Sequence, residues 1–272
     1  MPRATAFVPM LKPHELVEVV AGRLSISRNP LVITGAGMSA ESGVPTFREA
    51  QAGLWAQFNP LELSTPDAWM RDRELVWAWY CWRTSLVRRA EPHEGHRVLA
   101  RLGKRLPALQ LVTQNVDDLH QRAGSEGVIQ LHGSLFTPRC DTCGEAAEAT
   151  EMPTVPIDHP PQRLAPPTCT HCAGHLRPGV VWFNESLPEH AWRRASDAAM
   201  KADVVLLIGT SGLVYPAAGL PGAAMEAGAF VVEINPQETA LSRTISLHWS
   251  EGARVALSAI ERHLSQQGTS TP

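Results

Sequence analysis

Five short apolar segments, each ending in a glycine, an asparagine or a polar turn, place the strongest constraint on how this chain folds. Segments of this kind indicate short strands that are buried on both faces of a sheet. The stretches at 96–106 and 187–200 carry helical spacing instead. Strand and helix in alternation predict an α/β fold with a Rossmann-like, doubly wound parallel sheet. The expected strands lie at 31–34, 109–113, 128–131, 204–208 and 230–234.

Two stretches interrupt this alternation and predict a smaller region inserted into the sheet domain. Residues 49–92 contain no strand pattern, and they include Ser64-Thr65-Pro66, which is typical of a helix start. Residues 139–178 hold many prolines and two cysteine pairs, which favours a small loop-rich subdomain. We therefore expect a Rossmann-like domain formed by 13–48, 93–138 and 179–264, a helical module at 49–92 and a metal-binding subdomain at 139–178.

A glycine-rich turn of the form G-x-G-x-x-A follows the first expected strand at residues 35–40. Gly35 suits a tight turn, Gly37 permits close backbone approach, and Ala40 lets the next helix pack on the strand. Backbone N–H groups at such a helix start bind a pyrophosphate, although a purely structural turn is the alternative. No acidic residue follows at the end of a second strand about 20 residues on, which disfavours a standard dehydrogenase.

Four of the five cysteines form two Cys-x-x-Cys pairs, Cys140 with Cys143 and Cys169 with Cys172. In a cytosolic chain this pattern favours a metal over disulfides. Four thiolates make a closed, tetrahedral zinc site of the structural kind. The spacer between the pairs is longer than usual, and His171 is an alternative ligand. A redox pair or two free dithiols are the other interpretations.

Composition describes an ordinary soluble protein. Of the 272 residues, 44% are hydrophobic and 19% charged, and the net charge of −3 argues against a nucleic acid as the main ligand. The first twelve residues lack the charged and apolar segments of a secretory signal. The longest apolar run, at 204–209, is too short to cross a membrane. We expect a cytoplasmic protein without a membrane partner, for which a monomer is a suitable state.

Seven motifs in a fixed order resemble those of the sirtuin family. They are GAGMSAESGVPTFR at 35–48, TQNVDDLH at 113–120, LHGS at 131–134, the two cysteine pairs, VVWFNE at 180–185, GTS at 209–211 and Asn235. Together they extend over most of the chain, and the set is far more specific than the glycine pattern alone. One position departs from the family, because Asn184 stands where sirtuins commonly have glycine.

The resemblance implies an NAD-dependent enzyme that removes acyl groups from protein lysine side chains. Its products are nicotinamide, O-acyl-ADP-ribose and free lysine. NAD is the co-substrate, zinc is structural, and the partners are acyl-lysine proteins or peptides. The implied NAD-binding residues are Gly35, Ala36, Gly37, Phe47, Arg48, Gln114, Asn115, Asp117, Gly209, Thr210, Ser211, Asn235, Gly252 and Ala253. Val180, Val181, Trp182 and Phe183 are expected to pair edge to edge with the substrate peptide.

His132 is the expected catalytic base. A reaction at a ribose hydroxyl needs a neutral base near pH 7, and histidine is suited to that role. His132 follows a strand, at the carboxyl edge where α/β proteins bind ligands. A lone histidine in this place is ordinarily a packed core residue, and the surrounding motifs reverse that expectation. The resemblance further implies that Asn115 orients groups nearby and that Asp117 holds the nicotinamide carboxamide.

Tyr80 and Arg83 suggest which acyl group is removed. Residues three apart share a helix face, so a phenol and a guanidinium can point at one spot. In sirtuins that act on acidic acyl groups, a Tyr-x-x-Arg pair reads the distal carboxylate, which Arg can grip with two hydrogen bonds. Small residues at 52–53 would leave room for a longer chain. We expect succinyl and malonyl preference, whereas an exposed Arg on an amphipathic helix is the alternative.

Four other functions are compatible with parts of the sequence. A plain lysine deacetylase or a mono-ADP-ribosyltransferase would use the same NAD site. An NAD-sensing module without turnover would lack catalytic residues, yet His132, Asn115 and Asp117 are all present. A zinc-knuckle nucleic-acid binder would need a salt-sensitive basic surface, which the negative net charge disfavours.

Overall fold

A computed structural model, which describes residues 12–45, 63–147 and 151–268, contains a parallel six-stranded sheet. The strand order is β3-β2-β1-β6-β7-β8, and every neighbouring pair is parallel. The expected doubly wound sheet is therefore confirmed. The strands are β1 (Pro30–Thr34), β2 (Gln110–Thr113), β3 (Ile129–Gln130), β6 (Val204–Ile208), β7 (Phe230–Ile234) and β8 (Leu247–Trp249).

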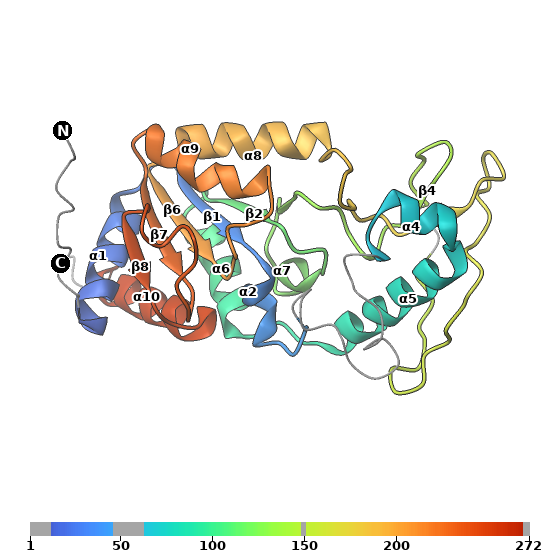
Figure 1. Cartoon of the computed structure of the whole chain (residues 1–272). Coiled ribbons are helices and arrows are strands. Elements are labelled where there is room, and N and C mark those ends of the chain that lie inside the picture. Colours follow the sequence, from blue (N-terminus) through green and yellow to red (C-terminus); the bar gives the residue numbers. More distant parts are fainter. Residues whose placement is uncertain (1–11, 46–62, 148–150, 269–272) are drawn as a thin grey trace.

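Helices cover both faces of this sheet (Figure 1). Alternate residues of β6 point to opposite sides, so that Leu206 and Ile208 join one core while Val205 and Leu207 join another. The first core includes α1 (Pro13–Ile26), α6 (Glu94–Arg105) and α10 (Ala253–Gly268). The second includes α8 (Glu189–Lys201), a short 3-10 helix (Ala217–Gly219) and α9 (Leu220–Glu226). Burial on both faces explains why β6 is apolar at every residue.

The helical module lies at the other end of the molecule, around α4 (Pro66–Arg71) and α5 (Arg73–Arg89) (Figure 1). The predicted helix start is correct, because the Thr65 hydroxyl accepts a hydrogen bond from the Ala68 N–H at 3.1 Å. Asp72 caps α5 in the same way through the Leu75 N–H. Tryptophans of α5 pack with Leu135 and Trp182 in a core separate from those of the sheet.

The zinc hairpin consists of β4 (Arg139–Cys140), β5 (Leu176–Arg177) and the turns that carry the four cysteines. The two strands are antiparallel, with Cys140 opposite Leu176. Figure 1 shows β4 beside α4, at the end of the molecule away from the sheet. Two short helices complete the described elements near the sheet, α2 (Ala36–Ala40) and α7 (Leu119–Arg122).

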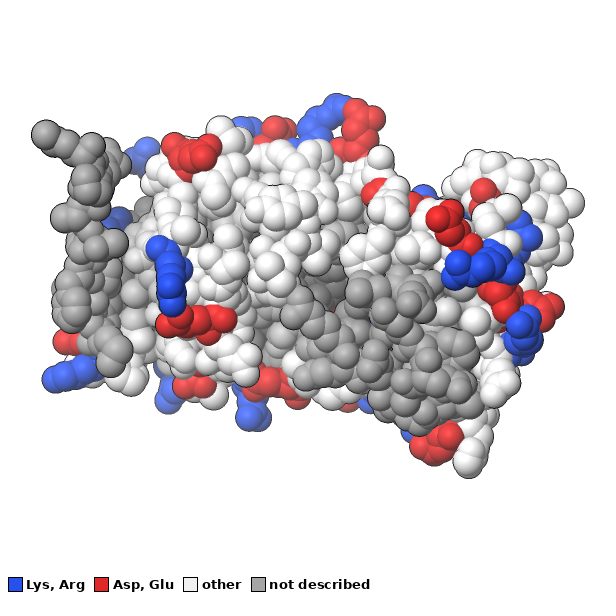
Figure 2. Space-filling view, in the orientation of Figure 1, with Lys and Arg blue, Asp and Glu red and all other residues white. Residues whose placement is uncertain are grey.

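The face of the molecule shown in Figure 2 agrees with the mixed composition. Figure 2 shows acidic and basic side chains side by side around the edge of one face. This mixture differs from the continuous basic surface of a nucleic-acid binder. Within the described ranges, no helix combines the length and the apolar character needed to cross a bilayer.

Candidate active site

Two glycine-containing loops press against each other where β1 and β6 end. The Gly37 N–H donates to the Gly209 carbonyl at 2.8 Å, and the Gly35 N–H donates to the Ile208 carbonyl at 3.0 Å. A Cβ on Gly37 would lie 2.7 Å from the Gly209 Cα. Gly209 has φ +60°, and a Cβ there would lie 2.4 Å from the Met38 nitrogen. The close backbone approach expected at Gly37 is therefore made to the loop that contains Gly209.

A buried polar network lies beside this loop contact. The Asn115 side-chain amide donates to the Ser39 hydroxyl at 3.0 Å, and Ser39 donates to Asp117 Oδ2 at 2.8 Å. The Leu119 N–H donates to the other Asp117 oxygen at 3.1 Å. Burial raises the pKa of the Asp117 carboxyl, and these two hydrogen bonds oppose the rise. The network brings the predicted Asn115 and Asp117 together and adds Ser39, which no sequence signal singled out.

His132 lies after β3 with its ring fixed by one hydrogen bond. Its Nδ1 is 2.8 Å from the Gln114 carbonyl oxygen. Because a carbonyl only accepts, Nδ1 carries the proton in the neutral ring and Nε2 keeps a free lone pair. Burial lowers the pKa of His132, and the bond to Gln114 opposes that shift only in part. The ring therefore stays neutral at pH 7, in the form that accepts a proton at Nε2. Because His132 is the predicted base, we call Ser39, Asn115, Asp117 and His132 the catalytic edge.

The backbone beside His132 is held by the segment that the sequence assigns to substrate binding. Gly133 faces Val180 in an antiparallel bridge, and the Val181 N–H donates to the His132 carbonyl at 2.8 Å. Gly133 has φ +73°, and a Cβ there would lie 2.1 Å from the Gly179 carbonyl oxygen. No larger residue fits beside the expected base.

The same segment continues toward the helical module. The Phe183 N–H donates to the Ser64 carbonyl at 2.9 Å, and the Phe183 side chain is 38% exposed. Asn184 adopts φ +68°, which glycine and asparagine tolerate better than other residues. Asparagine at this position is therefore compatible with the left-handed backbone that the structure shows. Pairing of residues 180–183 with a substrate peptide stays a prediction.

The remaining expected NAD contacts lie around the ends of β6, β7 and β8. The Asn235 side-chain amide donates to the Thr210 carbonyl at 3.0 Å, while Ser211 is exposed. Gly252 lies beside Glu41, whose Oε1 accepts the Arg254 N–H at 3.1 Å, so the end of α2 is tied to the start of α10. Ala36 begins α2, and Ala253 begins α10. Phe47 and Arg48 fall outside the described residues.

Tyr80 and Arg83 lie one turn apart on α5, as the sequence predicts. The Tyr80 residue is only 2% exposed, and its hydroxyl is 3.1 Å from the Ser64 hydroxyl and 2.9 Å from the Trp182 indole nitrogen. Burial raises the pKa of the Tyr80 phenol, and the positive charge of Arg83 opposes this rise. Arg83 stacks over the Trp79 ring, with its guanidinium carbon 5.0 Å from the ring centroid. The small residues at 52–53 lie outside the described part of the chain.

A small hollow adjoins Arg83 at the beginning of that undescribed stretch. Its lining residues are Val44, Pro45, Arg83, Leu86 and Val87. Burial lowers the pKa of the Arg83 guanidinium, while the negative charge of Asp117 opposes this change.

The four predicted cysteines form one cluster whose sulfur atoms all lie within 4.8 Å of one another. The sulfur atoms of Cys140 and Cys172 are 3.5 Å apart, and those of Cys143 and Cys169 are 3.9 Å apart. These separations are too long for disulfides, and tetrahedral zinc with Zn–S bonds of about 2.3 Å requires about 3.8 Å. Within the described residues the cluster contains only these four cysteines, so His171 is not one of its members. The cluster fits a structural zinc ion.

Comparisons with known proteins agree over most of the chain. A profile of the Sir2 family matches residues 35–216. The NAD-dependent protein deacylase Sir2 of Mycolicibacterium smegmatis is 51% identical over 235 residues, which cover 86% of this chain and 96% of that protein. Two solved structures are also similar. A Sir2 homologue in complex with NAD gives a TM-score of 0.83 at 40% identity, covering 94% of this chain and 95% of that one. A Sir2 protein with a deacetylated p53 peptide and 3′-O-acetyl-ADP-ribose gives 0.75 at 27% identity, covering 91% and 98%.

Proposed function

Because this chain belongs to the Sir2 family, we propose that it removes succinyl and malonyl groups from protein lysine side chains in preference to acetyl groups. The broader activity is that of an NAD-dependent protein deacylase, with NAD as co-substrate and acylated peptides as substrates. The finer preference rests on one observation. Tyr80 and Arg83 lie one turn apart on α5, and Arg83 lines a hollow together with Val44 and Pro45.

We assign the proton transfer to His132. NAD, when bound, supplies a ribose with nicotinamide as its leaving group and a neighbouring hydroxyl. His132 presents a free lone pair at Nε2, because its Nδ1–H is committed to the Gln114 carbonyl. This arrangement suits abstraction of a hydroxyl proton at neutral pH. The backbone on either side is fixed by the Gly133–Val180 bridge, so the ring is held in place before substrate arrives.

Asn115 and Asp117 are assigned to nicotinamide binding. Both are nearly fully buried and both contact Ser39, so neither side chain is free to turn toward water. The Asp117 carboxyl can accept hydrogen bonds from a carboxamide N–H₂ group, and Asn115 can donate or accept. Ser39 is therefore a positioning residue for this pair.

The four cysteines would hold zinc in a structural role only. A site closed by four thiolates has no open position at which water or substrate can bind. Backbone N–H groups of Thr142 and Cys143 point at the Cys140 sulfur from 3.4 and 3.5 Å, and such donors stabilise the thiolate that zinc requires.

Acidic acyl groups suit Tyr80 and Arg83 chemically. A guanidinium binds a carboxylate through two parallel N–H donors, and a phenol adds a third. Hydrogen bonds to a charged group contribute about 1.5–3 kcal/mol each, which corresponds to about ten- to hundred-fold in binding. Acetyl-lysine has no carboxylate and gains nothing from the guanidinium.

An acyl-peptide panel with NAD tests the preference directly. We expect kcat/KM for succinyl- and malonyl-lysine peptides to exceed that for the acetyl peptide by at least about ten-fold. Arg83→Met removes the charge and keeps much of the stem, so it should raise KM for the succinyl peptide selectively. Arg88→Met is the matched control, because Arg88 lies on the same helix but contacts Thr154 and Glu151. Preference of the wild type for acetyl-lysine, or an equal loss on both substrates in Arg83→Met, would overturn the proposal.

A further inference from the structure

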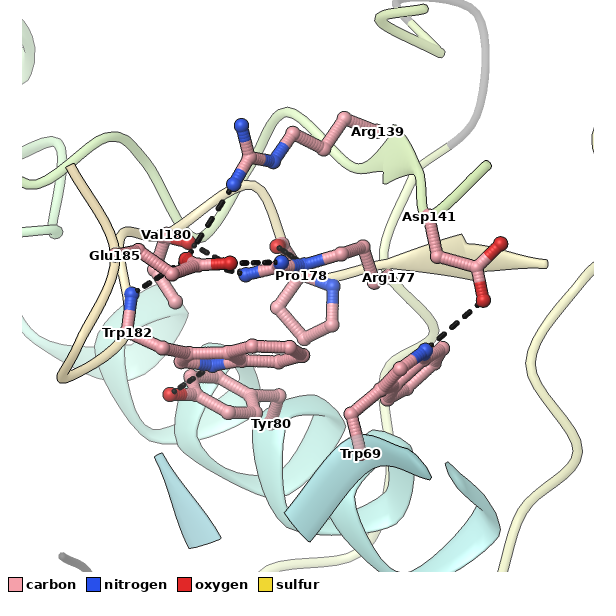
Figure 3. A network of polar contacts seen from close by, with 9 residues as sticks. All are labelled: Trp69, Tyr80, Arg139, Asp141, Arg177, Pro178, Val180, Trp182 and Glu185. Carbon is pink, nitrogen blue, oxygen red and sulfur yellow. Dashed lines mark hydrogen bonds and ion pairs between the residues drawn. The ribbon is translucent and has the colours of Figure 1, made fainter. Parts of the chain in front are cut away.

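A network of polar contacts joins the zinc hairpin to Tyr80, and the proposed function leaves it unexplained (Figure 3). It begins at Arg177, the last residue of β5, which is only 7% exposed. Its two terminal nitrogens lie 2.5 and 3.0 Å from the two Glu185 carboxylate oxygens. This is the bidentate geometry that makes arginine–carboxylate pairs specific in direction. Arg139 of β4 adds a second contact to Glu185 at 3.4 Å.

The network fixes Trp182 from two sides. Its backbone N–H donates to Glu185 Oε2 at 2.8 Å. Its indole ring lies against the Arg177 guanidinium, whose central carbon is 3.3 Å from the ring centroid, a cation–π contact. The Trp69 ring packs nearby, with 5.8 Å between the ring centroids. Since backbone and ring are both held, the indole keeps one orientation.

That orientation directs the indole N–H at the Tyr80 oxygen, which is 2.9 Å away (Figure 3). An indole N–H only donates, so the Tyr80 oxygen must accept this bond. The phenol proton is then left to donate elsewhere, to the Ser64 hydroxyl at 3.1 Å or to an incoming carboxylate. Trp182 and Tyr80 are 3% and 2% exposed, so bulk water does not compete for these groups.

We propose that Trp182 is a positioning residue for acyl selection, because its indole N–H orients the Tyr80 hydroxyl so that the phenol proton faces the acidic end of the acyl group. This inference rests on the proposed succinyl and malonyl preference. It also gives the zinc hairpin a part in specificity. Arg177 belongs to β5, which pairs with the strand that carries Cys140. The metal site therefore helps to position the Arg177 guanidinium, and the guanidinium positions the Trp182 indole.

A double-mutant cycle tests the role. Trp182→Phe keeps an aromatic face for Arg177 but removes the N–H donor. We expect it to raise KM for the succinyl peptide about two- to ten-fold, and to lower the ratio of succinyl to acetyl kcat/KM. In a Tyr80→Phe background the same change should add nothing, because the donor has no hydroxyl to act on. Additive effects of the two substitutions would overturn the inference.

Trp69→Phe is the matched control for the cycle. It makes the same chemical change in a ring that packs on Trp182, but its N–H donates to Asp141 instead of Tyr80. The succinyl to acetyl ratio should stay at the wild-type value. An equal fall in this ratio for Trp69→Phe and Trp182→Phe would show that general packing, not the N–H donor, is responsible.

A spectroscopic readout separates this inference from the proposed function. The chain has two tyrosines, Tyr80 and the exposed Tyr215, so 3-fluorotyrosine labelling gives two ¹⁹F resonances. Trp182→Phe should shift the Tyr80 resonance and leave that of Tyr215 in place. An unshifted Tyr80 resonance contradicts the positioning role, whichever acyl group is preferred. A shifted resonance in an enzyme without succinyl preference contradicts the proposed function and supports the contact itself.

Discussion

The catalytic edge rests on strands that are buried on both faces, whereas the zinc hairpin has hardly any apolar core of its own. Strands β1 and β6 are buried at every residue. In the hairpin, the buried cluster consists of Cys140, Cys169 and Leu176. Polar contacts help to attach the hairpin to its surroundings, such as the bond from Trp69 to Asp141 at 2.9 Å. The two regions therefore obtain their order from different sources.

This difference implies that the stability of the fold and the catalytic chemistry depend on the two regions to different degrees. The catalytic edge adjoins a sheet whose strands β1 and β6 are fully buried, so we expect loss of the half-buried His132 ring to have little effect on the fold. In the zinc hairpin the metal takes the place of a hydrophobic core, so the cysteines should matter for folding and not for proton transfer. Four experiments test whether changes in one region affect stability and changes in the other affect activity.

Loss of zinc should have the largest effect, and this effect should be a loss of stability in the hairpin. Structural zinc contributes on the order of 10 kcal/mol in small domains. Cys169→Ser or chelation should lower the melting temperature and expose the amides of β4 and β5 to hydrogen exchange, while β1 and β6 stay protected. Cys81→Ala is the control, because Cys81 lies in the α5 core and outside the cluster. Purified protein without zinc, or an unchanged melting temperature after chelation, would contradict the assignment.

Removal of the base should have the next largest effect, on turnover alone. His132→Ala should lower kcat/KM about 10²- to 10⁴-fold, the usual contribution of a general base. The melting temperature should change little, because the ring is only half-buried and makes one hydrogen bond to the backbone. His159→Ala alters an exposed histidine and should leave both quantities unchanged. Near-normal turnover in His132→Ala would remove it from the mechanism.

Gly209→Ala should lower both stability and NAD binding, because Gly209 lies in the contact between the two loops and in the predicted NAD site. The left-handed backbone costs a non-glycine residue about 1–2 kcal/mol, and the new methyl group would also lie 2.4 Å from the Met38 nitrogen. Gly127→Ala separates the two causes, since Gly127 has φ +64° but open space around it. Denaturant unfolding should show about 1–2 kcal/mol for Gly127→Ala and clearly more for Gly209→Ala. Weakened NAD binding by calorimetry should accompany Gly209→Ala alone. Equal losses in both variants would mean that the loop contact is unimportant.

The pH dependence should be the smallest effect. Burial places the pKa of His132 below the ordinary value of 6.5, and the neutral ring is the active form. Activity should therefore fall to half of its maximum only below pH 6.5. Between pH 7.5 and 6.5, kcat/KM should change by less than the roughly two-fold expected for an unperturbed histidine. A half-maximal rate at pH 6.5 or above would contradict the lowered pKa.

Local patterns predicted the sheet well, because they reflect burial directly. The expected strands at 204–208 and 230–234 coincide with β6 and β7. Strand β8 has only three residues, one of them the half-buried His248, which is too short for an apolar run to be recognised. The four-cysteine cluster was predictable because its spacing is a property of the ligands themselves.

The contacts that position the site were hidden because they join distant residues. Ser39 meets Asn115 and Asp117 from 76 and 78 residues away, and it stands in the sequence among small residues that suit a turn. Arg177 and Glu185 look like solvent-exposed charges until the fold places them around Trp182. Gly37 belongs to a motif that the sequence made recognisable, but the motif did not predict that its nearest neighbour is the Gly209 loop.

The contact between the loops of residues 37 and 209 also has a consequence for synthesis on the ribosome. The first loop emerges early, but its partner arrives only after the helical module and the zinc hairpin have been made. Until β6 emerges, one side of β1 has no neighbour, and an unpaired apolar strand invites association with other chains. Nascent chains that stop short of β6 should therefore bind NAD poorly and depend on chaperones. The NAD site is one of the last parts of this enzyme to be completed.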